Sequence, residues 1–147
     1  MRPEQPGLIT CLIHDSGGRF YASKGYIQKR RRPRNYQDCK THNFLSFSNT
    51  DQMLEYLAVL GLELTAAQFK VGSSNSLVAW EMVKQGFGIA SMSVDVVRAS
   101  PDLEVLLPDS DPVMFPTWLV THRELHTSRR IRLVFDLLAV ELPKLMA

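Results

Sequence analysis

The sequence has few features of a secreted, membrane-bound or disulfide-stabilised protein. It contains only two cysteines, Cys11 and Cys39, which are too few for a disulfide framework, so a reducing cytoplasm is the expected location. No apolar run reaches the length of a membrane span, and the first six residues, MRPEQP, lack the apolar core of a signal peptide. We therefore expect a cytoplasmic protein with no membrane partner.

The motifs of common hydrolases and metal sites are missing as well. There is no Gly-x-Ser-x-Gly elbow, and the run His122–His126 has its Glu one place too late for the helix of a zinc protease. Two further pairs, Cys11-x-x-His14 and Cys39-x-x-His42, supply enough zinc ligands, but their spacing fits no standard zinc finger. We predict no metal, no cofactor and no catalytic residue, and hence no enzyme.

A large excess of one charge is also absent. Lys and Arg number 17 and Asp and Glu 15, and the formal net charge of +2 is too small to indicate nucleic-acid binding by itself. Five of the six residues at Lys29–Arg34 are basic, and such a run is able to touch phosphate. Beside a proline, however, it is more often a solvated loop. Hydrophobic residues make up 45% of the chain, which is enough for a packed core.

What the chain does contain is centred on the stretch Phe69–Val97. A Ser or Asn is a favoured N-cap, and the residues from there through Lys84 include no Gly or Pro. Gly86 supplies the stop, because glycine tolerates the left-handed conformation that ends helices. We predict a strand at 69–71, a helix through Lys84, a buried strand at Phe87–Ala90 and a short helix at 94–98.

This order of elements predicts a βαβ unit, in which the two strands run parallel with a right-handed crossover. Ligands collect at the carboxyl ends of such strands, beside the helix N-termini. The cluster Ser73, Ser74, Asn75 and Ser76 lies at that place and offers hydroxyls, backbone N–H groups and the helix dipole to an anion. The alternative is a plain N-cap. Residues 47–50 form a similar polar segment after a strand, with an ordinary turn as the alternative.

The remaining elements are predicted more briefly. Further strands are expected at residues 8–13, 20–23, 43–47, 103–107 and 117–121, a short helix at 23–30, and a short turn or helix at 35–40. Composition predicts a turn at Asp15–Gly18 and loops at Ser48–Asp51 and Pro108–Pro116. The segment Met53–Leu62 fits both strand and helix. Glu124–Leu142 has apolar residues at three- and four-residue spacing, which predicts one long amphipathic helix.

Four stretches carry a resemblance to a known family. They are FYASKGYI at 20–27 with Arg32-Pro33 after it, FLSF at 44–47, EMVKQGFGIA at 81–90, and, most specifically, WLVTHREL, SRRIR and FDLLA between 118 and 139. Together they resemble the effector-binding (substrate-binding-like) domain of LysR-type transcriptional regulators, from about Leu8 to the end of the chain. One departure is Met92-Ser93, where family members often carry proline.

The resemblance implies an α/β fold of the periplasmic-binding-protein type 2, with two lobes and a ligand cleft. Residues 1–22 would be a remnant of the first lobe and first crossover, 23–99 the largely complete second lobe, and 100–147 the second crossover and the return to a partial first lobe. The cleft residues implied by the family are Phe47, Ser48, Asn49, Thr50, Ser73, Ser74 and Asn75.

The expected function follows from this resemblance. The chain would be the effector-binding and oligomerisation domain of a regulator that senses a small organic acid or anion, and it would form a homo-oligomer. It would meet DNA only through the family's winged helix-turn-helix, which no part of this sequence resembles. The alternative is a truncated remnant that only dimerises, through apolar surface on the last helix and the Thr117–Thr121 strand.

Overall fold

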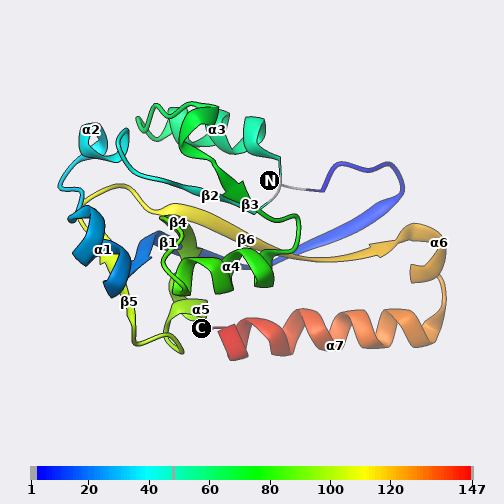
Figure 1. Cartoon of the computed structure of the whole chain (residues 1–147). Helices are drawn as coiled ribbons and strands as arrows, with labels where there is room; N and C mark the ends of the chain where they lie inside the picture. The colour runs from blue at the N-terminus through cyan, green and yellow to red at the C-terminus, as the bar shows by residue number, and fades with distance from the viewer. Residues whose placement is uncertain (1–2, 48, 147) are drawn as a thin grey trace. The chain divides into compact units, whose positions relative to one another are not determined.

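The computed structural model describes residues 3–47 and 49–146, which form six strands, seven α-helices and a 3-10 helix (Figure 1). The elements are β1 (Leu8–Ser23), α1 (Lys24–Arg30), α2 (Tyr36–Cys39), β2 (Leu45–Ser46), α3 (Thr50–Val59), η1 (Ala66–Gln68), β3 (Val71–Gly72), α4 (Ser76–Lys84), β4 (Ala90–Ser93), α5 (Val94–Val97), β5 (Leu103–Leu106), β6 (Val113–His122), α6 (Arg123–His126) and α7 (Arg129–Met146). None of the helices in the described ranges is long and apolar enough to cross a membrane.

The described chain divides into two compact units. One contains the residues up to Gly17 together with those from Met114 onward, and the other runs from Gly18 to Val113. Strands β1 and β6 contribute residues to both units. The three-part lobe division at residues 22/23 and 99/100 stays a prediction.

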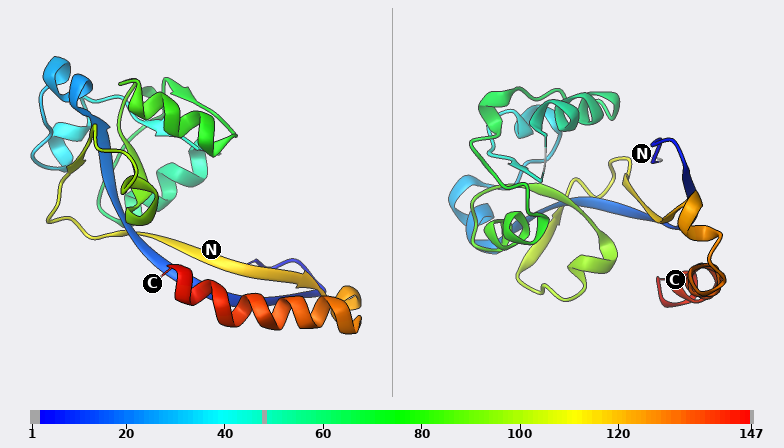
Figure 2. Two further views of the ribbon diagram at one scale, coloured as in Figure 1. Left: turned by 90° about the horizontal axis from the view of Figure 1, so that it is seen from below. Right: turned by 90° about the vertical axis from the view of Figure 1, so that its right-hand side faces the viewer.

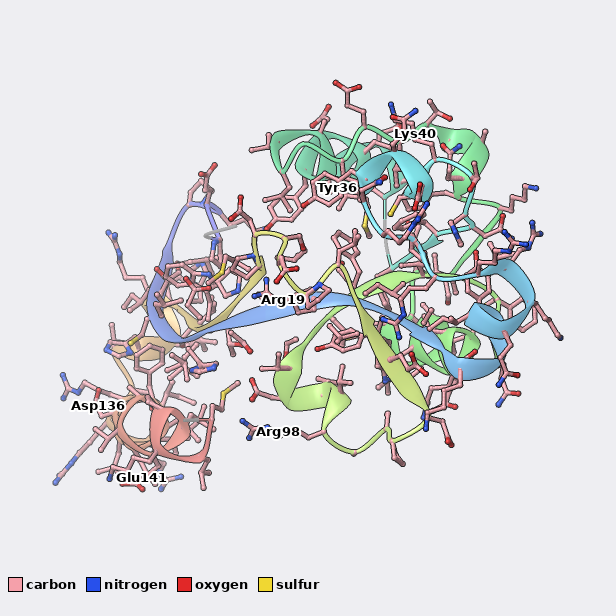
Figure 3. The ribbon with its side chains drawn as sticks, turned by 90° about the vertical axis from the view of Figure 1, so that its left-hand side faces the viewer. Arg19, Tyr36, Lys40, Arg98, Asp136 and Glu141 are labelled. Carbon is pink, nitrogen blue, oxygen red and sulfur yellow. The ribbon has the colours of Figure 1, made fainter. Side chains whose placement is uncertain are left out.

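Strand β1 is continuous over 16 residues, so the turn predicted at Asp15–Gly18 is wrong. Gly17 and Gly18 do not have positive φ, and Gly18 pairs with Ser93 of β4. Glycine enters an extended strand as readily as a turn, and here the sheet pairing decides. Further along, β1 lies between β4 and β5, both antiparallel to it. Arg19 on β1 also donates from Nη1 to the Ser110 carbonyl at 2.7 Å (Figure 3).

The second sheet consists of β2 and β3, and the predicted βαβ unit extends from it through α4 to the segment at Ile89. Strands β2 and β3 pair in parallel, and Phe44 makes a parallel bridge to Ile89 on the other side. The strands before and after α4 therefore run parallel, as predicted, with β2 between them. The predicted strand at Phe87–Ala90 is displaced: its regular part is β4, and Phe87 donates its N–H to the Met82 carbonyl at 3.1 Å, which still belongs to the helix end.

The core of the Gly18–Val113 unit joins both sheets to α4. Tyr21, Leu45, Trp80, Val83 and Ala90 are buried together, and the rings of Tyr21 and Trp80 meet edge to face at 6.3 Å. An edge-to-face pair is favourable beyond its buried area, by about 0.5–1.5 kcal/mol. This packing holds the middle and the last turn of α4 against the strands that lead to the candidate site.

Two predicted helices differ from the structure. Met53–Leu62, left open between strand and helix, belongs mainly to helix α3, which already begins at Thr50 inside the predicted loop. The long helix at 124–142 is broken into the short α6 and the long α7 (Figure 2). At the break Thr127 donates its hydroxyl to the Glu124 carbonyl at 2.6 Å. Such side-chain hydrogen bonds compete with the regular helix ladder.

Strand β6 begins three residues before Pro116, so the loop predicted at Pro108–Pro116 ends too late. A proline lacks the N–H of the ladder and is tolerated where one side of a strand is unpaired. β6 pairs with β1, and α6 and α7 follow it. No described side chain of α7 is fully buried: the predicted apolar face is half-buried at Phe135, Leu138 and Leu142, while Ile131 and Val134 on it are exposed.

Candidate functional site

A pocket of about 290 Å³ lies where β2 and β3 end and α3 begins. We call it the serine pocket, and its lining residues are Ser46, Thr50, Phe69, Val71, Gly72, Ser73 and Ser74. Because β2 and β3 are parallel, their carboxyl ends lie at the same edge of the sheet, and helices α3 and α4 each start shortly after one of these strands.

Three of the predicted site residues, Thr50, Ser73 and Ser74, line this pocket. They come from two polar segments that are separated by more than 20 residues in the sequence, and the parallel pairing of β2 with β3 brings them together. The Ser73 N–H donates to the Ser46 carbonyl at 3.0 Å, which continues the ladder by one residue and anchors the second segment.

The two predicted asparagines are helix N-caps. The Asn49 side-chain oxygen accepts from the N–H groups of Asp51 and Gln52 at 2.9 and 3.4 Å. The Asn75 oxygen accepts likewise from Leu77 and Val78 at 3.0 and 3.3 Å. The capping alternative that the sequence left open therefore applies to Asn75, whereas residues 47–50, with an ordinary turn as their alternative, instead lead into helix α3 through the Asn49 cap. A ligand contact by either asparagine stays a prediction.

The last two predicted residues lie elsewhere. Phe47 is half-buried and packs against the core cluster, outside the lining of the serine pocket. Ser48 lies outside the described residues. Both stay predictions as ligand contacts.

Four lining residues were not predicted: Ser46, Phe69, Val71 and Gly72. The sequence predicts Phe69 and Val71 only as an apolar strand, although their i, i+2 spacing places both side chains on one face. A Cβ on Gly72 would meet the Ser46 carbonyl oxygen at 2.9 Å, so only glycine allows this close approach of β2 and β3. Ser46 is 4% exposed, and a buried serine in an apolar run was the signal for it.

The chemistry of the serine pocket is neutral. Its lining combines hydroxyls and backbone groups with two apolar side chains and contains no ionisable residue. Hydroxyl donors near a helix N-terminus suit an anionic group, while Phe69 and Val71 suit a small apolar body. In the described ranges no three His, Cys, Asp or Glu side chains lie close enough together to hold a metal ion.

The cysteine and histidine of the pair at 39 and 42 serve the packing of the Gly18–Val113 unit. Burial raises the pKa of the Cys39 thiol to about 12. Burial also lowers the pKa of His42, helped by the charge of Arg30 and opposed by Asp38. The Tyr26 hydroxyl accepts from the Asn43 N–H at 3.0 Å and lies 3.2 Å from His42 Nδ1. The hydrogen bond between them runs from the hydroxyl to Nδ1 in one tautomer of the neutral imidazole and in the opposite direction in the other.

Comparisons with known proteins agree with this fold. The family described as the LysR substrate binding domain matches residues 1–142. The regulatory domain of CrgA, a LysR-type transcriptional regulator from Neisseria meningitidis, is similar with a TM-score of 0.77 and 22% identity, over 97% of this chain and 72% of that domain. The effector domain of the regulator AmpR of Pseudomonas aeruginosa is similar with a TM-score of 0.71 and 17% identity, over 98% and 69%.

The chain spans only 49% of the CrgA structure that is not limited to the regulatory domain, where the TM-score is 0.76 and the identity 22%. Among curated proteins no match was found.

These findings confirm the resemblance and the fold class. The mixed α/β sheets match LysR substrate-binding domains, which have the periplasmic-binding-protein-like fold of type 2. The family match is to a domain of transcription regulators and not to an enzyme. The chain therefore belongs to the LysR substrate-binding domain family.

Proposed function

We propose that this chain senses a small organic acid or anion in the serine pocket, as the effector-binding part of a LysR-type regulator. The observation that carries the proposal is the meeting of Thr50, Ser73 and Ser74 at the carboxyl ends of two parallel strands. Hydroxyls at this place donate to a carboxylate, and the two capped helices that start there add the positive ends of their dipoles.

The rest of the expected function belongs to the same proposal. The regulator acts in the cytoplasm, forms a homo-oligomer and contacts DNA through a domain outside this chain. The predicted contacts of Phe47, Ser48, Asn49 and Asn75 complete the ligand site. The predicted division into a second lobe at 23–99 and a first lobe flanking it assigns the serine pocket to the second lobe.

A screen of organic acids by thermal shift tests this proposal. The whole chain is compared with the double variant Ser73→Ala/Ser74→Ala and with Ser100→Ala, whose side chain lies outside the pocket lining. We expect at least one acid to raise the melting temperature of the chain and of Ser100→Ala, and to bind the double variant at least tenfold more weakly. An equal response of all three proteins, or no response to any acid, contradicts the assignment.

A second candidate function is a dimerising module that binds no ligand. Leu133, Leu137 and Val140 form a stripe on α7 with exposed fractions of 67%, 58% and 57%. Their i, i+4, i+7 spacing is that of a helix-pairing seam. Dimerisation through the stripe, with no organic acid binding to the chain, would favour this function over ligand sensing. A monodisperse monomer at high concentration would argue against the dimerising module.

A further inference from the structure

The basic run at Lys29–Arg34 surrounds a hollow in the structure. From the sequence, a solvated loop is the more common form of such a run. The cavity measures about 660 Å³ and is lined by Arg30, Arg31, Arg32, Arg34, Thr41 and His42, beside Asp38. We call it the arginine basin. All these residues belong to the Gly18–Val113 unit, and none lines the serine pocket. Its volume lies within the range of about 300–1,000 Å³ that is typical of small-molecule sites.

The charge of the basin is strongly unbalanced. Four guanidinium groups face one carboxylate, Asp38, and the lowered pKa of His42 keeps its imidazole neutral near pH 7. The guanidinium of Arg32 is already engaged, since it pairs with Glu104 and donates to the Val105 carbonyl. Within the described ranges, the side chains of Arg30 and Arg31 make no hydrogen bond or ion pair. At least two positive groups are therefore free to meet an anion.

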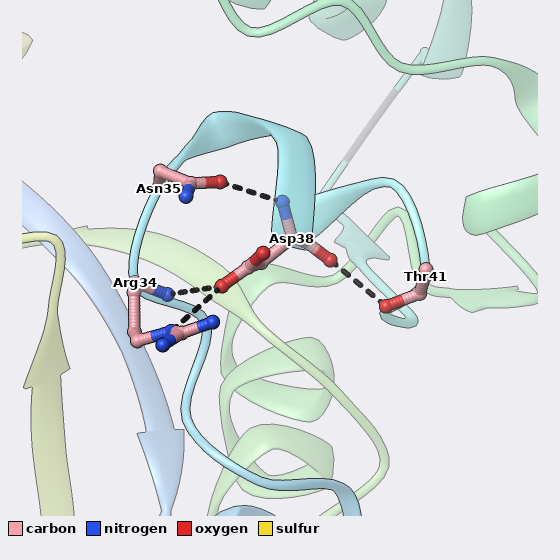
Figure 4. Close-up of polar contacts among 4 residues, drawn as sticks. All are labelled: Arg34, Asn35, Asp38 and Thr41. Atoms are coloured by element: carbon pink, nitrogen blue, oxygen red, sulfur yellow. Dashed lines mark hydrogen bonds and ion pairs between the residues drawn. The ribbon is translucent and has the colours of Figure 1, made fainter.

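The wall of the basin is well ordered by hydrogen bonds around α2 (Figure 4). Asp38 Oδ2 accepts from the Arg34 backbone N–H at 2.9 Å and lies 3.5 Å from its Nε, and these contacts lower the pKa of Asp38. Asn35 caps the helix by accepting from the Asp38 N–H at 2.9 Å, and Thr41 donates its hydroxyl to the Asp38 carbonyl at 2.9 Å. Arg34 thus contacts Asp38 through its backbone N–H and its Nε, while its side chain, 84% exposed, stays accessible to an anion.

The opposite side is shaped by the end of α1. Arg30 is the last helical residue, and Arg31 has φ 66° and ψ 163°, a backbone conformation that residues other than glycine rarely adopt. Pro33 then limits the chain to its fixed φ and is buried. The three consecutive arginines therefore do not extend as a regular strand or helix but stay around the hollow.

The lining chemistry indicates what the basin recognises. A guanidinium presents a planar fork of N–H donors that matches two oxygens of a phosphate group. No Phe, Tyr or Trp lines the cavity, so the aromatic rings on which single-stranded nucleic-acid bases stack are missing from its lining. We propose that the arginine basin binds a phosphate-bearing anion, through Arg30 and Arg31 with Arg34 and Thr41, as a site separate from the serine pocket.

Inorganic pyrophosphate is a suitable probe because it carries the phosphate chemistry without a base or sugar. Its binding to the whole chain is measured by titration calorimetry at constant ionic strength, with chloride and citrate as anions of other geometry. The variant is Arg30→Gln/Arg31→Gln, and the matched control is Arg129→Gln/Arg130→Gln, an exposed pair of adjacent arginines that removes the same charge from the other unit.

We expect saturable pyrophosphate binding that weakens at least tenfold in Arg30→Gln/Arg31→Gln and by less than twofold in the control. Arg30→Lys/Arg31→Lys keeps the charge but loses the forks, and should bind with an intermediate affinity. Absence of saturable binding, or equal weakening in both Gln variants, overturns the proposal. Circular dichroism of each variant verifies that the fold is retained.

A DNA duplex of unrelated sequence distinguishes the source of the phosphate. Pyrophosphate binding without duplex binding supports a free phosphorylated metabolite. Duplex binding that pyrophosphate displaces, and that is lost in Arg30→Gln/Arg31→Gln, supports the same phosphate chemistry with nucleic acid as its source. If the duplex binds equally well with pyrophosphate present and in Arg30→Gln/Arg31→Gln, the DNA contacts another surface of the chain. If in addition pyrophosphate does not bind, the proposed site is overturned.

Discussion

Single buried side chains in the Gly18–Val113 unit have measurable chemical consequences. Cys39 is 1% exposed, and its thiol pKa of about 12 leaves roughly a thousandfold less thiolate than the ordinary value of 9.0 would give. We predict that iodoacetamide at pH 8 modifies the half-exposed Cys11 and leaves Cys39 unmodified in the folded chain, as read by peptide mass spectrometry. In urea both should react, and modification of Cys39 at the same rate as Cys11 without urea contradicts the burial.

His42 predicts a pH dependence of stability. Its folded-state pKa lies below the ordinary value of 6.5, so the unfolded chain binds a proton first as the pH falls, and the free energy of unfolding decreases below about pH 6.5. At higher pH both states are neutral and the loss disappears. His42→Asn keeps an acceptor for the Tyr26 hydroxyl but does not titrate.

Urea unfolding at pH 7.5 and pH 5 checks this sign. The stability difference between the two pH values should be smaller in His42→Asn than in the unmodified chain. An identical pH difference in both proteins would show that the pKa of His42 does not differ between the folded and unfolded states.

At the scale of elements, the N-cap of α4 links helix stability to the serine pocket. Asn75 satisfies the N–H groups of Leu77 and Val78, and removal of such a cap costs about 0.5–2 kcal/mol. We predict that Asn75→Ala lowers the free energy of unfolding by about 1 kcal/mol, measured by urea denaturation. Asn75→Asp retains an acceptor and should keep most of the stability, so equal losses in both variants would contradict a capping role.

The stripe on α7 predicts an oligomer. Glu141 pairs with Lys144 at 2.7 Å, and Asp136 and Glu141 are labelled on the same helix in Figure 3, so charged side chains accompany the apolar stripe. We predict a concentration-dependent dimer in analytical ultracentrifugation and a monomer for Leu133→Gln/Leu137→Gln/Val140→Gln. As a control, Val59→Gln/Leu77→Gln changes two exposed apolar residues on other helices and should remain dimeric. A dimer in the triple variant would exclude this surface.

Comparison of these elements with the sequence shows where local patterns suffice. Ser23 and Asn75 lie at helix starts, where the required hydrogen bonds are short-range and therefore readable from the sequence. The cap at Asn49 was missed because its segment has the composition of a loop. Thr50 and Ser73 line the same pocket because β2 pairs in parallel with β3. The periodicity of apolar residues in the sequence does not determine which strands pair. Gly17-Gly18 misled the prediction because composition cannot distinguish an extended glycine in a paired strand from a turn.

At the scale of the whole molecule, the two compact units differ in burial. The Gly18–Val113 unit holds fully buried side chains such as Phe20, Leu57 and Val83, whereas α7 in the other unit has none in its described part. Helices with few buried contacts open at low cost in free energy. In hydrogen exchange followed by mass spectrometry at low protein concentration, we predict that α7 peptides exchange at least tenfold faster than α4 peptides. Equal protection at every concentration contradicts this.

The neutral lining of the serine pocket has a further consequence for how its ligand is identified. No residue of that lining changes its charge between about pH 5 and pH 9. If the proposed sensing holds, the variation of affinity with pH mirrors the titration of the bound molecule rather than that of its receptor. The midpoint of the curve of affinity against pH then gives the pKa of the ligand. This value distinguishes a carboxylic acid from an anion with a weaker acidic group before the ligand has been identified.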